Sequence, residues 1–224
     1  MARKPKPNSQ KAPPASKPAS SSSEPAAVLI FSGPPTPIYL GPRSAASNST
    51  FLKTHNITHV LSIGSSAHRA VQGVTYTRLM LNDSIESSIG KVCDDACAVI
   101  DSINGKSNSN ASQIQPEGEQ STDSDTKQKR LNQQSTPKPI LVHCSAGVSR
   151  SPTIIAAYLI KRQGLTLKQA LGLMIRARPI VCPNSGFLEQ LKEMEIEARG
   201  ECSMQDVDEL PKKKEDRLKL VADE

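Results

Sequence analysis

The chain has 224 residues, a formal net charge of +6 at pH 7 and 36% hydrophobic residues, with three Phe, three Tyr and no Trp. A length of this order suits one domain with tails, and the low apolar content predicts that part of the chain lies outside a packed core. No apolar run approaches the ~18 residues that a membrane-spanning helix needs, so a transmembrane protein is excluded and no membrane partner is expected.

The cysteines and the charge distribution bear on location and partners. The basic N-terminus lacks the apolar stretch of a secretory signal, and the five cysteines then favour free thiols in a reducing compartment. We therefore expect an intracellular protein in the cytoplasm, the nucleus or both. The basic excess lies mostly in residues 1–24 and is not interleaved with aromatic residues, so no nucleic-acid partner is expected. The sequence leaves the oligomeric state open.

Several short apolar runs predict strands in the first half of the chain. Residues 1–25 contain six Pro and six Ser and predict a disordered basic arm. Beyond this arm, a short helix is expected over 44–55, and apolar residues from Val92 to Ile103 recur at helical spacing. The predicted strands cover residues 28–31, 38–40, 59–63 and 74–81.

The second half opens with a segment of different composition. Residues 105–138 are predicted to be a low-complexity insertion, because they are rich in polar residues and too long for an ordinary connection. A β-branched strand over 140–142 follows, and then three helices. These helices are predicted over 153–163, from a Thr166 and Gln169 capping box to Pro179, and from Asn184 to Gly200.

Strands that alternate with helices predict an α/β fold. We expect a single domain over residues 26–200 with a central, mostly parallel mixed sheet flanked by helices. Residues 201–224 are predicted to be a charged C-terminal tail. Within that tail, Lys212–Lys214 form a basic run that suits a solvated surface better than a nuclear signal.

The most informative segment is the loop between the buried strand at 140–142 and the buried helix that follows it. Cys144 stands at the N-terminus of this helix, where free N–H groups and the helix dipole should lower its pKa into a range of about 3.5–7.5. The same nest of N–H groups suits a phosphate dianion, and Arg150 can hold two phosphate oxygens at once. The predicted phosphate-binding residues, besides Arg150, are Ser145, Ala146, Gly147, Val148 and Ser149.

Three segments together resemble the dual-specificity phosphatases, a branch of the Cys-dependent protein tyrosine phosphatases. Residues 143–151 match the signature HCxxGxxR(S/T). The segment IYLGPRSAASNSTFLKTHNITHVLSIG resembles the start of that family's domain, and RPIVCPNSGFLEQL resembles its RPxxxPNxxFxxQL segment. The resemblance covers about residues 28–104 and 138–199 and implies a phosphatase-type loop between strand and helix. It also implies hydrolysis of phosphotyrosine and phosphoserine or phosphothreonine in protein substrates.

The chemistry assigns roles to the residues of this loop. The Cys144 thiolate attacks phosphorus and forms a cysteinyl phosphate, while Arg150 and the loop N–H groups stabilise the equatorial oxygens. The Ser151 hydroxyl is placed to stabilise the departing thiolate. The resemblance implies that His143 orients and tunes Cys144 and that Asn184 braces the loop. No metal and no cofactor are expected, because the positive loop supplies the charge that a metal would supply.

The general acid is predicted to be Asp83. It follows the strand predicted over 74–81, at the edge where strands of an α/β sheet present their ligands, and MLNDS resembles the family's acid-bearing segment. A simpler interpretation is that Asp83 only caps a turn, in which case Glu86 is the next candidate. The carboxylates of the helix near 92–103, Asp94, Asp95 and Asp101, are expected to point to solvent.

Three alternatives remain open. The substrate could be a non-protein phosphate, such as an RNA 5′ end, a phosphoinositide or a glycan, although the loop lacks the Lys pair of the tensin-like lipid phosphatases. The domain could bind phosphopeptides without turnover, although such modules usually lack the Cys or the Arg of the loop. Cys182, in the RPIVCPN turn, is interpreted as a buried thiol rather than a disulfide partner of Cys144.

Overall fold

A computed structural model describes residues 27–104 and 137–222. The predicted N-terminal arm and nearly all of the predicted insertion lie outside the described residues. None of the helices within the described ranges is long and apolar enough to cross a membrane.

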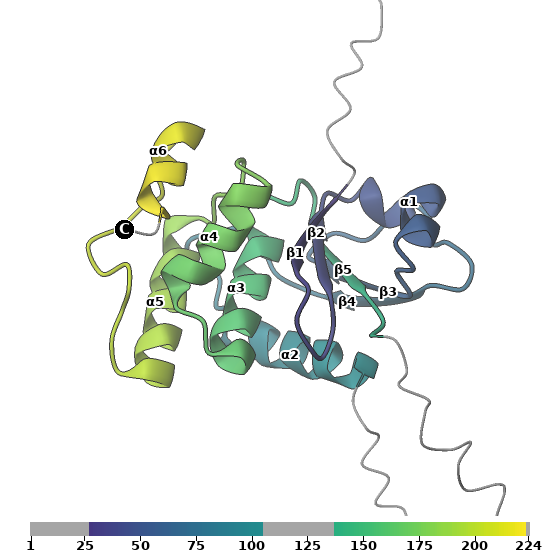
Figure 1. Cartoon of the computed structure of the whole chain (residues 1–224), viewed down its shortest axis with the longest axis horizontal. Coiled ribbons are helices and arrows are strands. Elements are labelled where there is room, and N and C mark those ends of the chain that lie inside the picture. Colours follow the sequence, from purple (N-terminus) through teal and green to yellow (C-terminus); the bar gives the residue numbers. More distant parts are fainter. Residues whose placement is uncertain (1–26, 105–136, 223–224) are drawn as a thin grey trace, which may run out of the picture.

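The core of the molecule is one five-stranded sheet with strand order β1-β2-β5-β3-β4 (Figure 1). The first two strands are antiparallel, and the pairs β2–β5, β5–β3 and β3–β4 are parallel. The sheet is therefore mixed and mostly parallel, as predicted. The strands are β1 (Val28–Phe31), β2 (Ile38–Gly41), β3 (His59–Ile63), β4 (Thr75–Leu79) and β5 (Ile140–His143).

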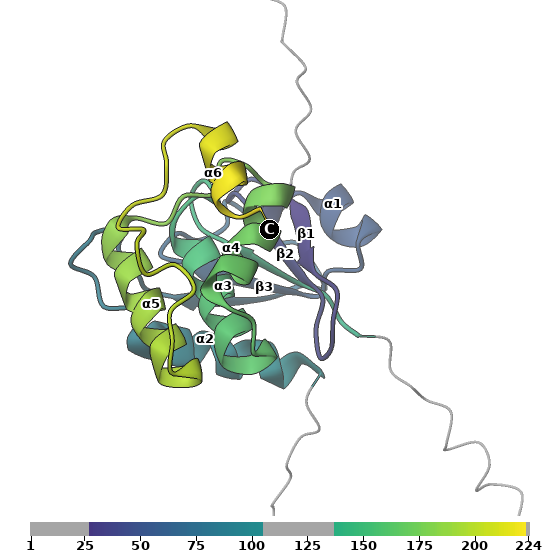
Figure 2. The same cartoon turned by 60° about the vertical axis from the view of Figure 1, so that its left-hand side comes forward.

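Helices cover both faces of the sheet. On one face lie α2 (Gly90–Asn104), α3 (Arg150–Gln163), α4 (Leu167–Ala177) and α5 (Ser185–Arg199), and on the other lie the 3-10 turn η1 (Ala45–Ser47) and α1 (Ser49–Thr54). The helix α3 contacts α2, α4, α5 and the central strands, and Figure 2 shows it in the middle of the helical layer. Because neighbours surround it, its residues from Ser151 to Ile160 are all buried.

Local sequence signals set the ends of the later helices. The Thr166 hydroxyl accepts from the Gln169 backbone N–H, and the Gln169 side chain accepts from the Thr166 N–H, which forms the predicted capping box. The Asn184 side chain caps α5 by accepting from the N–H of Phe187. The helix α5 ends at Gly200, whose left-handed φ of 81° a residue with a side chain adopts less readily.

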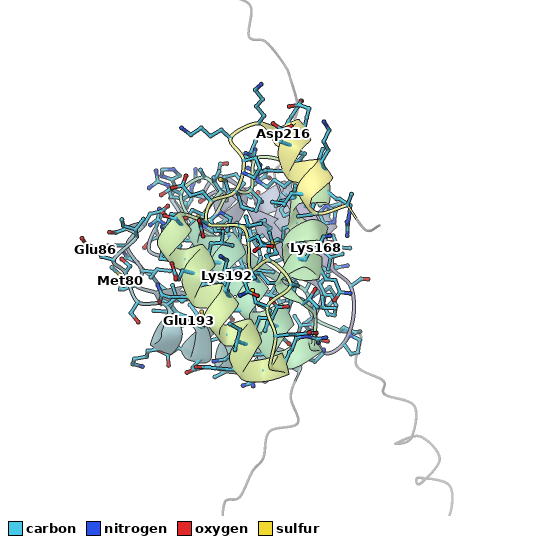
Figure 3. The ribbon with its side chains drawn as sticks, turned by 90° about the vertical axis from the view of Figure 1, so that its left-hand side faces the viewer. Met80, Glu86, Lys168, Lys192, Glu193 and Asp216 are labelled. Carbon is cyan, nitrogen blue, oxygen red and sulfur yellow. The ribbon has the colours of Figure 1, made fainter. Side chains whose placement is uncertain are left out.

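The chain beyond Gly200 differs from the predicted tail, because residues 201–222 pack against the domain. Met204, Leu210 and Val221 are buried in the main core, and a short helix, α6 (Lys214–Leu220), follows. Figure 3 shows this segment lying along α5. The apolar anchors are few and widely separated among charged residues, so the average composition of the segment conceals them.

A buried arginine fastens this segment to the domain. Arg217 is only 6% exposed and donates to the carbonyl oxygens of Pro179, Pro211 and Lys212. On α5, the Lys192 ammonium donates to the carbonyl of Gln205 at 3.2 Å. These contacts bring the C-terminal segment against the loop that joins α4 to α5.

Candidate active site

The predicted phosphate-binding loop lies where expected, between β5 and α3, at the carboxyl edge of the parallel strands. Gly147 has a left-handed φ of 69°, and a Cβ atom there would lie 2.7 Å from the carbonyl oxygen of Gly41. Glycine is therefore required both by the backbone conformation and by the close approach of the loop to the end of β2.

Cys144 is 2% exposed, and its sulfur is surrounded by donors. The Ser151 hydroxyl and the Gly147 backbone N–H each donate to Sγ at 3.3 Å. Burial by itself raises the pKa of the thiol, but these hydrogen bonds, with backbone N–H groups of Ser151 and Val148, outweigh it and leave the pKa of Cys144 lowered. The site thus favours the nucleophilic thiolate.

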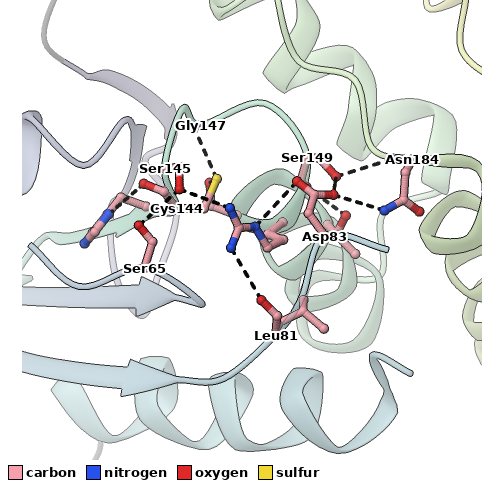
Figure 4. A network of polar contacts seen from close by, with 12 residues as sticks. Ser65, Leu81, Asp83, Cys144, Ser145, Gly147, Ser149 and Asn184 are labelled. Atoms are coloured by element: carbon pink, nitrogen blue, oxygen red, sulfur yellow. Dashed lines mark hydrogen bonds and ion pairs between the residues drawn. The ribbon is translucent and has the colours of Figure 1, made fainter. Parts of the chain in front are cut away.

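Arg150 begins α3, and its guanidinium is oriented by three neighbours (Figure 4). Its Nη2 donates to the Ser145 hydroxyl at 3.1 Å, and its Nη1 donates to the Leu81 carbonyl at 3.5 Å. The Nε atom lies 3.5 Å from a carboxylate oxygen of Asp83 but, among the described residues, is buried without a hydrogen-bond partner. An unsatisfied donor beside a nucleophile is suited to an oxygen of a bound phosphate.

His143 is fully buried behind the loop, and its hydrogen bonds fix its tautomer. Burial and the charge of Arg43 lower the pKa of His143, outweighing the opposing effect of the Cys144 carbonyl, so the ring is neutral. Because a carbonyl only accepts, Nδ1–H donates to the Cys144 oxygen at 3.0 Å, and Nε2 accepts from the Ser62 hydroxyl at 2.8 Å. The ring therefore holds the backbone of Cys144.

The structure brings Asp83 to the phosphate-binding loop. The strand β4 ends at Leu79, two residues earlier than predicted, and the following turn carries the carboxylate back toward the loop. One carboxylate oxygen accepts from the Ser149 hydroxyl at 2.7 Å and from the Asn184 amide at 3.1 Å (Figure 4). Asn184 therefore links α5 both to Asp83 and to the loop.

The other candidate acids are not brought to the loop. Glu86 is exposed, and no hydrogen bond or ion pair of its carboxylate is recorded within the described ranges. The three carboxylates on α2, Asp94, Asp95 and Asp101, form ion pairs with Lys161, Lys91 and Arg162 respectively.

Two further contacts of the loop were missed by sequence reasoning. Arg178 is 8% exposed, and its guanidinium donates to the carbonyls of Ala146 at 3.1 Å and Gly147 at 3.4 Å. These bonds hold the backbone carbonyls of the loop in place. The Arg that opens RPIVCPN was the available signal. In the same turn, the N–H of Cys182 donates to the Val148 carbonyl at 2.8 Å, and both Cys182 and Cys144 are free thiols.

The turn that carries Asp83 is also held by α5, through contacts that neither a motif nor periodicity predicts. Gln190 accepts from the N–H of Ile89 at 2.9 Å and donates to the carbonyl of Ser87 at 3.0 Å. Gly186 lies so close that a Cβ atom there would be 2.0 Å from the carbonyl oxygen of Ile85. The helix and the acid-bearing turn therefore form one packed unit.

Comparisons with known proteins agree with this geometry. The model of the dual specificity phosphatase catalytic domain matches residues 126–197. The chain is 32% identical to dual specificity protein phosphatase 1 of Arabidopsis thaliana, over 70% of this chain and 65% of the relative. The chain is therefore similar to the dual-specificity phosphatase family, both in these matches and in the motif around Cys144.

Other members of the dual-specificity phosphatase family extend the match. Dual specificity protein phosphatase 15 of Mus musculus is 32% identical over 70% of this chain and 54% of its own length. The crystal structure of DUSP15 superposes with a TM-score of 0.54 at 29% identity, covering 73% of this chain and 86% of that one. The first curated relatives are longer than the matched region, since the chain spans 65%, 59%, 18% and 54% of their lengths.

Proposed function

We propose that this protein is a metal-independent protein phosphatase that hydrolyses phosphotyrosine and phosphoserine or phosphothreonine through a cysteinyl phosphate. The observation that carries the proposal is the Cys144 sulfur, held at 3.3 Å by two donors beside the guanidinium of Arg150. This arrangement combines a nucleophile at lowered pKa with a binding site for the equatorial phosphate oxygens.

In the first step, the thiolate of Cys144 attacks phosphorus opposite the leaving oxygen. The S–P bond forms as the P–O bond to the substrate breaks, and Asp83 transfers a proton to the leaving oxygen. The hydrogen bonds from Ser149 and Asn184 direct the carboxyl group toward the loop. The backbone N–H groups of the loop and Arg150 balance the charge on the three transferred oxygens.

In the second step, Asp83 accepts a proton from water as the water oxygen bonds to phosphorus. The S–P bond breaks, inorganic phosphate leaves and the Cys144 thiolate is restored. The Ser151 hydroxyl donates to this departing sulfur, which is the role proposed for it. His143 and Arg178 act indirectly, because they bond backbone carbonyls of the loop and keep its N–H groups oriented.

We also propose the wider assignments that accompany this chemistry. The catalytic domain starts near residue 26, the partners are phosphorylated proteins, and neither a metal nor a cofactor takes part. Free thiols at all five cysteines support an intracellular location. A non-protein phosphate remains the alternative substrate, and a non-catalytic phosphopeptide module is disfavoured because Cys144 and Arg150 are both present.

Turnover by the purified chain in the presence of a chelator tests the proposal. We expect release of phosphate from para-nitrophenyl phosphate and from peptides that contain phosphotyrosine or phosphothreonine. Cys144→Ser should abolish turnover but still bind vanadate or tungstate, because the N–H groups and Arg150 remain. Cys182→Ser is the matched control and should stay active. An active Cys144→Ser variant, or a wild-type chain that binds phosphopeptides without releasing phosphate, would reject the assignment.

A further inference from the structure

The acidic residues of this chain are distributed unevenly. The chain has 22 Asp and Glu residues, but none lies between Pro25 and Asn82. The same span holds four basic residues, Arg43, Lys53, Arg69 and Arg78. This span contributes β1 to β4, η1 and α1, so these elements and their connections carry positive charge without any carboxylate of their own.

The strand register places one of these charges close to the phosphate-binding loop. Arg78 on β4 pairs with Ser62 on β3, and Ser62 pairs with His143 on β5. Two strand spacings separate Arg78 from His143, a distance of about 10 Å between their backbones. Side chains in register on parallel strands share a face, so Arg78 projects on the same face as Ser62 and His143.

A loop over residues 64–73 connects this strand edge to the active site. At its start, the Ser65 hydroxyl accepts from the Ser145 hydroxyl of the phosphate-binding loop at 3.2 Å. Farther along, the N–H of Arg69 donates to the Ser47 hydroxyl, and the Arg69 side chain is exposed. A cavity of about 170 Å³ lies beneath this loop, and its lining includes Ser62, Ser66, Ala70 and Arg78.

Arg69 and Arg78 have no carboxylate partner in the described part of the chain. The ion pairs found there involve Arg150, Arg162 and four lysines that come after residue 82. Arg69 and Arg78 are both exposed, so an incoming anion reaches them without breaking an existing pair.

We propose that Arg78, the cavity that it lines and Arg69, which precedes the lining residue Ala70, form an acid-binding subsite for a peptide segment that flanks the phosphorylated residue. The carboxylates or the second phosphate of such a segment would supply the negative charge that this span of the chain lacks. The inference rests on the proposed phosphatase function and narrows its substrates to acidic phosphopeptides. Charge complementarity of this kind acts mainly on recognition and on the rate of association.

A peptide fits this surface better than a nucleic acid does. Binding of single-stranded nucleic acid combines basic residues with aromatic side chains on which bases stack. All six aromatic residues of this chain are described, and none of them is exposed. Tyr76, which lines the cavity, is committed to the structure, because its hydroxyl donates to the Ala46 carbonyl and accepts from the N–H of Val71.

The test compares matched phosphopeptides that differ only beside the phosphorylated residue, with Glu, Gln, Lys or phosphoserine at the flanking positions. For the wild-type chain at low salt, we expect kcat/KM to be about fivefold to tenfold higher for the Glu and phosphoserine peptides than for the Gln peptide. In the double variant Arg69→Ala and Arg78→Ala this preference should fall to about one. Comparison of Glu with phosphoserine separates carboxylate from phosphate recognition.

Two controls separate failure of the subsite from failure of the proposed activity. Lys53→Ala removes a charge from the same carboxylate-free span but on α1, beside the residues that precede β3 and β4 and so at the amino ends of these strands, and should keep the preference. Para-nitrophenyl phosphate, which has no flanking groups, should be hydrolysed equally by all variants. If it is hydrolysed but the acidic preference is absent or survives the double variant, the subsite is refuted and the activity stands. Selective loss of activity on 5′-phosphorylated RNA in the double variant would also refute the peptide assignment.

Discussion

Removing the Ser151 hydroxyl tests how this site stabilises a buried thiolate. Burial opposes ionisation of Cys144, so the lowered pKa depends on the hydrogen bonds that reach the sulfur, and the bond from Ser151 is one of them. A hydrogen bond to a charged group contributes about 1.5–3 kcal/mol. Since one pKa unit corresponds to about 1.4 kcal/mol, Ser151→Ala should raise the pKa of Cys144 by about 1–2 units.

The assay is the rate of alkylation of Cys144 by iodoacetamide as a function of pH. Only the thiolate reacts, so a raised pKa moves the midpoint of the profile to higher pH. The acidic limb of kcat/KM should move in the same direction. Thr153→Val is the matched control, because its hydroxyl donates to the Ser149 carbonyl and not to the sulfur. An unchanged midpoint in Ser151→Ala would refute the argument and assign the lowered pKa to the backbone N–H groups alone.

Three other substitutions probe separate parts of the molecule. Asp83→Asn should reduce kcat by a factor of about 10²–10⁴ and remove the basic limb of the pH–rate profile, and unchanged pH dependence would leave Asp83 a structural role only. Arg150→Lys should be severely impaired in steady-state turnover, because an ammonium cannot bind two phosphate oxygens in the plane of a guanidinium, and activity near wild type would contradict that role. Leu210→Ala should lower the melting temperature by about 5–10 °C, because it leaves a cavity in the main core.

The fold class and the position of the loop that holds Cys144 and Arg150 were predictable because local patterns encode them. Alternation of apolar strands and helices indicated the α/β sheet, and the spacing of Cys144 and Arg150 around a glycine indicated the loop. The capping box at Thr166 is likewise a pattern of neighbouring residues, and the structure confirms it.

Contacts between distant segments leave no local pattern in the sequence, so the partners of Asp83 could not be predicted in this way. Asn184 and Asp83 are 101 residues apart in the sequence, and Ser149 and Asp83 are 66 apart. Ser149 was predicted only as part of the phosphate-binding loop, yet its hydroxyl is the shortest contact of Asp83. The hydrogen bonds between Gln190 and the turn that carries Asp83 depend on how α5 packs. Neither periodicity nor composition specifies that packing.

The packing of the C-terminal segment also depends on contacts between distant residues. Leu210→Ala measures how much this packing contributes to the free energy of unfolding. Leu210 is 5% exposed within the main core, so truncation leaves a cavity, at the lower end of the ~2–5 kcal/mol range because the site lies near the surface. For a domain of this size, about 2–3 kcal/mol corresponds to a fall of about 5–10 °C in melting temperature. Lys219→Ala, at an exposed position of α6, should have almost no effect. Thermal unfolding followed by circular dichroism distinguishes the two. If both variants melt with the wild type, residues 201–222 behave as the solvated tail that their composition suggests, and the burial of Leu210 contributes nothing measurable to stability.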